Sequence, residues 1–147
     1  MKVIFVVLLL SGFIFPQSDL DKLIKDVKKD YSINDLSNFG VLLAQRGYFL
    51  EAISIFKEVI SQNQTRDKDY NNIGNCYYDL GSKEEALRFY LKAIAINPKN
   101  EQSLQSIGQC YYEKGELELA LKYFKKSAQL GNTIIQNWIK NNGYDTE

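Results

Sequence analysis

Histidine does not occur in this sequence of 147 residues. Its absence removes the commonest general base, a common metal ligand and the side chain that titrates near neutral pH. A zinc site built on the two cysteines would need carboxylates, and no ligand spacing suggests one. No phosphate-binding loop, pair of catalytic carboxylates or nucleophile motif occurs either. We therefore assign no catalytic, metal-binding or cofactor-binding residue, and we expect neither enzymatic activity nor a small-molecule substrate.

Net charge is also absent, because 18 basic and 18 acidic residues balance. A nucleic-acid-binding protein usually carries an excess of basic residues on one face, so the composition argues against such a partner. Apolar residues make up 45% of the chain, which is enough for a single domain with a modest core.

An apolar run from Val3 to Phe15 follows Lys2 and ends at a polar break that begins with Pro16. The run is short for a membrane span, which needs about 20 residues, but it has the length of a signal-peptide core. No Ala-x-Ala cleavage pattern occurs, and no cysteine follows that could carry a lipid. We predict that residues 1–18 are a signal peptide and that the protein is exported to the periplasm, the cell envelope or the medium. An uncleaved membrane anchor is the alternative, and only this segment would then touch the membrane.

The heptapeptide NCYYDLG, which begins at Asn75, recurs as QCYYEKG 34 residues later. Each repeat predicts two helices, because apolar residues recur at helical spacing and no long stretch alternates in the manner of a strand. Ser32 with Asp35, and Ser82 with Glu85, have the spacing of capping boxes. The fold class predicted is therefore all-α.

This 34-residue helix-turn-helix period resembles that of the tetratricopeptide repeat (TPR) family. The resemblance covers three units, at residues 33–66, 67–100 and 101–134. It implies a right-handed α-solenoid, because one hairpin cannot cover its own apolar face and neighbours must stack. The family's pattern is met in the second unit by Tyr70, Ile73, Gly74, Tyr77, Ala86, Tyr90, Ala93 and Pro98, and the other two units lack the proline.

Both ends of the stack need covering. Residues 19–32 predict an amphipathic capping helix, and residues 135–147 predict a C-terminal capping helix and tail. Asn132 is the expected N-cap of the latter, and Trp138 is expected to plug the last hairpin. An exposed ligand platform at Trp138 is the alternative.

Cys76 and Cys110 occupy the same position in adjacent units. Stacked helices lie about 8–10 Å apart, whereas a disulfide needs Cα atoms within about 7 Å. Neither cysteine is near a histidine or a helix N-terminus, so we expect two buried thiols without special reactivity.

In the TPR family, the first helices of successive hairpins line a concave groove that holds peptides or partner helices. The resemblance implies that amide and tyrosine side chains on these helices meet a protein or peptide partner. An ordinary polar surface is the alternative. The implied partner-binding residues are Asn71, Asn75, Tyr78 and Asp79 of the second unit, and Gln105, Gln109, Tyr112 and Glu113 of the third.

Some TPR domains clamp the C-terminal carboxylate of chaperone tails with lysine, asparagine and arginine. The matching positions here hold Ser37, Val41, Asn72, Gln102 and Ser106, so only Asn72 agrees and this function is not expected. Two functions remain. The first is a non-catalytic interaction module that binds a protein or peptide in the groove. The second is a structural subunit that assembles in a cell-envelope complex through end-cap surfaces around Trp138.

Overall fold

The computed structural model describes residues 16–144, so residues 1–15 of the predicted signal peptide lie outside it. No strand occurs among these residues, and the predicted all-α fold class is confirmed. None of the described helices is long and apolar enough to cross a membrane. The helices are α2 (Gln17–Asp30), α3 (Ile33–Gln45), α4 (Phe49–Gln62), α5 (Asp67–Asp79), α6 (Lys83–Ile96), α7 (Glu101–Glu113), α8 (Leu117–Gln129) and α9 (Thr133–Asn141).

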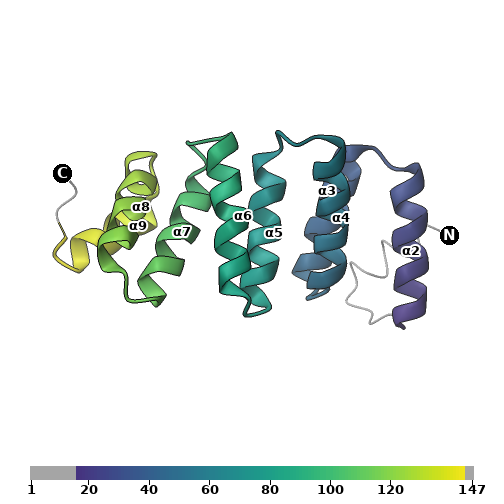
Figure 1. Ribbon diagram of the computed structural model, residues 1–147, viewed down its shortest axis with the longest axis horizontal. Helices are drawn as coiled ribbons and strands as arrows, with labels where there is room; N and C mark the ends of the chain where they lie inside the picture. The colour runs from purple at the N-terminus through teal and green to yellow at the C-terminus, as the bar shows by residue number, and fades with distance from the viewer. Residues whose placement is uncertain (1–15, 145–147) are drawn as a thin grey trace.

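Three helical hairpins form the body of the molecule, namely α3 with α4, α5 with α6 and α7 with α8 (Figure 1). Their first helices begin at Ile33, Asp67 and Glu101, each 34 residues after the one before. Each hairpin packs on the next, so the helices stand in one elongated row from α2 to α9 (Figure 1). The predicted α-solenoid is therefore confirmed.

Within a hairpin, a glycine of the first helix lies against an aromatic ring of the second. A Cβ added at Gly74 would lie 2.5 Å from the Tyr90 ring, and one at Gly40 would lie 2.7 Å from the Phe56 ring. Both rings are buried, with 2% and 0% of their surface exposed. Close-packed interiors leave no room for a further methyl group, which explains why glycine recurs at this position.

The predicted helix caps are partly correct. The Ser32 side chain accepts a hydrogen bond from the Asp35 backbone N–H (3.3 Å), and the Asn132 side chain accepts one from the Ile135 N–H (3.1 Å). The predicted capping box at Ser82 is wrong, because its side chain makes no cap hydrogen bond at the start of α6.

Both end helices begin two residues earlier than predicted. Helix α2 starts at Gln17 after Pro16, a residue that favours the first turn of a helix. Helix α9 starts at Thr133 directly after its asparagine cap. The apolar stripe of α2 packs on the first hairpin and is buried at Leu20, Leu23, Ile24 and Val27.

Candidate partner-binding groove

A hollow of about 410 Å³ lies between the first helices of the second and third hairpins. Five of the eight predicted partner-binding residues line it. On one helix, side chains three or four residues apart share a face, which is why α5 and α7 can each present several of them to the same hollow. The lining residues are Asn75, Tyr78, Asp79, Tyr90, Gln105, Ser106 and Gln109.

A second hollow of about 260 Å³ lies between α3 and α5. Asn75 and Asp79 line both hollows, so the two adjoin along the first helices. We call the surface of the two hollows the groove. The second hollow is lined by Val41, Ala44, Gln45, Phe56, Asn72, Asn75 and Asp79.

Asn71 does not face the groove. It is 2% exposed, and its side-chain oxygen accepts a hydrogen bond from the Ser103 hydroxyl (2.8 Å) of the next hairpin. The prediction that Asn71 belongs to the partner-binding surface is therefore wrong. The equivalent residue of the first unit, Ser37, donates to Asp69 (2.5 Å), and Gln105 accepts from the Asn132 amide (2.6 Å).

These three bonds form an inter-repeat ladder, which we define by its members Ser37, Asn71 and Gln105 on the three first helices. Each bond joins one unit to the next. Asn71 is buried and Ser37 and Gln105 are half-buried, and a buried polar group must be hydrogen-bonded, so these side chains help to hold the stack together. Of the three, only Gln105 also reaches the groove.

Glu113 is the acceptor at the centre of a polar cluster on the groove rim. Its side chain accepts hydrogen bonds from Gln109 (2.8 Å) and the Tyr78 hydroxyl, and it pairs with Lys83 (2.5 Å). The Gln109 bond, then those of Lys83 and Tyr78, lower the pKa of Glu113 to about 2. By accepting a hydrogen bond from the Tyr78 hydroxyl, Glu113 in turn raises the pKa of Tyr78 to about 12. The cluster joins the second and third hairpins, and the Tyr78 hydroxyl is part of that connection. Tyr78 therefore stabilises the packing of the two hairpins and also lines the groove.

Tyr112 lies beside Trp138 and lines neither hollow. Their ring centroids are 5.4 Å apart in an edge-on arrangement, and Tyr112 is 45% exposed. Trp138 also packs on Phe124 (5.0 Å) and Tyr144 (5.8 Å). The half-buried indole thus covers the end of the third hairpin, as expected for a plug, while Tyr112 remains accessible next to it.

Tyr90 and Ser106 were missed as groove residues. Tyr90 was named only as a match to the family's pattern, but it lines the groove and its hydroxyl donates to the Asn75 side chain (2.9 Å). Ser106 was considered only as a mismatched clamp position. Its place one helical turn before Gln109 and Cys110 was the signal that could have found it.

Both cysteines are buried and unpaired with each other, as predicted. Burial, the largest cause, raises the pKa of both the Cys76 and Cys110 thiols to about 11. Because the thiolate is the reactive form, neither is suited to nucleophilic or redox chemistry at neutral pH. In the described part of the chain, no group of three or more cysteine and carboxylate side chains is placed to hold a metal ion.

Comparison with known proteins gives the same repeat. Two family models, both described as tetratricopeptide repeat, match residues 68–100 and 89–122. The matched residues of this chain are thus tetratricopeptide repeats, in agreement with the predicted resemblance to the TPR family. A search of curated proteins found no significant match. Among solved structures 183 chains match, so the fold alone does not identify a partner.

Three of these structures illustrate the likeness. MamA has a TM-score of 0.67 at 26% identity, with 79% of this chain and 71% of that chain covered. The first TPR of Spaghetti (RPAP3), bound to an HSP90 peptide, has a TM-score of 0.68 at 19% identity, with 74% and 88% covered. The Yersinia enterocolitica type III secretion chaperone SycD, in complex with a peptide of the translocator YopD, has a TM-score of 0.68 at 16% identity, with 74% and 90% covered. The last two likenesses concern the fold alone.

Proposed function

We propose that this protein binds a peptide segment of a partner protein in the groove and catalyses no reaction. The proposal depends on the two hollows adjoining at Asn75 and Asp79, because together they extend the site along α3, α5 and α7. An elongated site of this kind suits a segment of chain better than a compact small molecule. The peptide-bound RPAP3 and SycD structures have the same fold and support this choice.

The chemistry of the groove favours recognition of a peptide backbone. Amides of Asn72, Asn75, Gln105 and Gln109 offer both donors and acceptors, which match the N–H and C=O groups of an extended segment. Asp79 is exposed at the centre and favours a cationic side chain or N–H groups opposite it. The pattern differs from a carboxylate clamp, so we do not propose binding of a chain terminus.

Affinity capture with matched variants tests the proposal. We also propose export of the protein, so the bait is the chain from Gln17 onward and the source is a cell-envelope extract. The groove variant Asn75→Ala/Asp79→Ala is compared with Gln62→Ala/Glu84→Ala, an exposed amide and carboxylate that line neither hollow. We expect the captured proteins, identified by mass spectrometry, to be lost with the groove variant and kept with the control. Equal capture by both variants would contradict groove binding.

An assembly subunit joined through the Trp138 end remains the alternative prediction. Trp138 is engaged with three aromatic rings, which leaves less of it for a second copy. Light scattering measures the oligomeric state and so separates the two functions. A monomer that loses its partner on groove mutation supports peptide binding, whereas an oligomer supports assembly.

A further inference from the structure

The two hollows of the groove are equivalent positions in successive repeats. Six of the seven residues that line the hollow between α3 and α5 have a counterpart 34 residues later in the lining of the hollow between α5 and α7. Phe56 corresponds to Tyr90 in this way, and Asn72 corresponds to Ser106. If α9 stands in the row as a further first helix, a third position of the same kind lies between α7 and α9.

Helix α9 does take the place of a first helix. It follows an asparagine cap, Asn132, as α7 follows Asn100, and each cap side chain accepts a hydrogen bond from the N–H three residues on. Counted from these caps, Ile139 takes the place of Ile107, and both are fully buried. The residues of α9 can therefore be matched one by one to those of α7.

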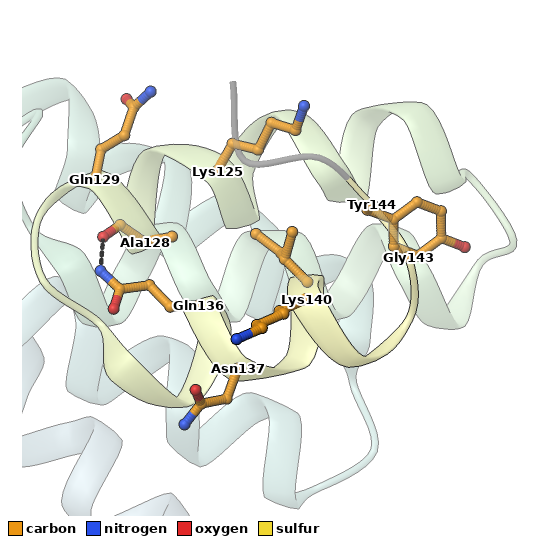
Figure 2. A pocket seen from close by; sticks show the side chains of 9 residues that line it. Lys125, Ala128, Gln129, Gln136, Asn137, Lys140, Gly143 and Tyr144 are labelled. Atoms are coloured by element: carbon orange, nitrogen blue, oxygen red, sulfur yellow. Dashed lines mark hydrogen bonds between the residues drawn. The ribbon is translucent and has the colours of Figure 1, made fainter.

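Contacts on one face of α9 fix its orientation on the third hairpin. Figure 2 shows this face, with the hydrogen bond from the Gln136 amide to the Ala128 carbonyl of α8 (2.7 Å). The hollow of about 590 Å³ between α8 and α9 lies on the same face and shares no lining residue with the groove. Trp138 is on the opposite face, where α9 meets α7.

An indole ring occupies the third position, where the first two positions are hollow. By the same count, Trp138 takes the place of Ser106, which lines the groove. Its ring packs on Phe124 (5.0 Å between ring centroids) and edge-on against Tyr112 (5.4 Å). Each of these two aromatic residues stands 34 residues after a tyrosine that lines the groove. The third position is thus built like the other two, but aromatic side chains fill it.

The accessible surface at the third position is apolar. Tyr112 is 45% exposed and Ile134 is 71% exposed. Ile134 lies four residues before Trp138, so the two side chains share a face of α9. We call Tyr112, Ile134 and Trp138 the apolar patch. Amides and a carboxylate line the groove between α3 and α7, whereas the row ends in this patch.

We propose that the apolar patch extends the groove and holds an apolar side chain of the same partner segment. This inference rests on the proposed function, because the patch is too small to bind a protein by itself. Three side chains of this size offer roughly a few hundred Å², whereas each partner in a stable interface buries about 800 Å². The same shortfall argues against a second copy of the chain as the occupant.

The distance between groove and patch predicts a sequence pattern in the segment. Asp79 favours a cationic side chain opposite it, and the patch lies one to two helices further along the row. Packed helices are about 8–10 Å apart, and an extended chain advances about 3.3 Å per residue. We therefore expect an aliphatic or aromatic residue about three to six positions away from a lysine or arginine.

Selection from a phage-displayed library of random dodecapeptides tests the proposal. The bait is the chain from Gln17 to its C-terminal end. Enriched peptides are synthesised with a fluorescein label, and their affinities for the chain and its variants are measured by fluorescence anisotropy. Circular dichroism checks that every variant keeps its helix content.

Two variants alter the patch and one serves as a matched control. Tyr112→Ala/Ile134→Ala removes both exposed side chains. Ile134→Gln changes only a side chain that is 71% exposed, so it tests the patch without disturbing the packing of Trp138. The control, Leu50→Ala/Leu117→Ala, removes two leucines that are 66% and 37% exposed and line neither hollow of the groove.

We expect Tyr112→Ala/Ile134→Ala to weaken binding of the enriched peptides by about tenfold, and Ile134→Gln by at least about threefold. The control should change binding by less than about twofold. Asn75→Ala/Asp79→Ala should also weaken binding of the same peptides, because one segment is expected to span both places.

The other outcomes overturn the inference in distinguishable ways. Peptides that are lost with Asn75→Ala/Asp79→Ala but kept with both patch variants would contradict the inference and leave the proposed function standing. Peptides that do not respond to the groove variant, or no enriched peptide at all, would contradict the proposed function and the inference with it. Equal weakening by the control would mean non-specific apolar attraction. A dimer that Ile134→Gln converts to a monomer in light scattering would make the occupant a second copy, and the proposal would be wrong.

Discussion

Replacing Gly74 with alanine sets two physical effects against each other. Alanine stabilises a helix interior by about 1 kcal/mol relative to glycine. Against this, the new Cβ would lie 2.5 and 2.6 Å from two atoms of the Tyr90 ring. The ring cannot swing into solvent, because it is 2% exposed and its hydroxyl is held by Asn75 (2.9 Å). Overpacking costs about 1–3 kcal/mol, and two contacts below 3.0 Å with a ring that cannot move place this case in the upper part of that range, at about 2–3 kcal/mol. We therefore expect a net loss of about 1–2 kcal/mol.

Urea denaturation followed by circular dichroism measures this loss, together with a fall in Tm of about 3–6 °C for a chain of this size. A double-mutant cycle with Tyr90→Leu identifies the cause, since the smaller side chain should remove the penalty of Gly74→Ala. A variant at least as stable as the wild type would refute the reasoning, because helix propensity would then outweigh the contact. An undiminished penalty in the Tyr90→Leu background would mean that the strain lies elsewhere.

Three further predictions follow from buried or charged groups. The pKa of Glu113 is about 2 in the folded protein, below the ordinary glutamate value of 4.5, so its contribution to stability is present above pH 4.5 and is lost as the pH falls towards 2. The stability difference between wild type and Glu113→Gln, from urea midpoints at several pH values, should therefore shrink over this range, and a constant difference would contradict it. The Asp69 carboxylate is buried and lies 2.5 Å from the Arg66 guanidinium. Arg66→Ala removes this ion pair and should destabilise the fold by about 3 kcal/mol in urea denaturation. A cost near zero would refute this. Cys76 and Cys110 should react with a thiol reagent only as the protein unfolds, and fast modification of the native chain would be the contrary result.

The fold was predictable because it depends on local patterns repeated three times. A glycine at Gly40 and Gly74, an aromatic residue 16 positions later and a turn glycine at Gly81 recur with the period, and the structure uses each of them for close packing or for a turn. The start of the first helix was less predictable, because Pro16 initiates α2 without a side-chain cap. Asn132, in contrast, was predicted as a cap from its residue type, and α9 starts directly after it.

The candidate site was predictable only in part. Asn71 and Asn75 are both polar and lie one turn apart on the same helix, yet one is buried under Ser103 and the other lines the groove. Which of the two is buried depends on the rotation of the next hairpin, a tertiary property. The double role of Tyr78 has the same origin, because its acceptor Glu113 is 35 residues away in another unit.

The C-terminal end shows how a change of register can hide the structural position of a residue in a repeat. Aligned by the 34-residue period, Lys140 is one more surface lysine. The last hairpin shifts this alignment, because α8 ends one residue early and the connection to α9 has three residues where the two preceding hairpins have four. Counted instead from the asparagine caps, Lys140 stands where Gly74 and Gly108 admit an aromatic ring. A lysine is too large for that contact, so a helix cannot pack on α9 there in the way that α6 packs on α5.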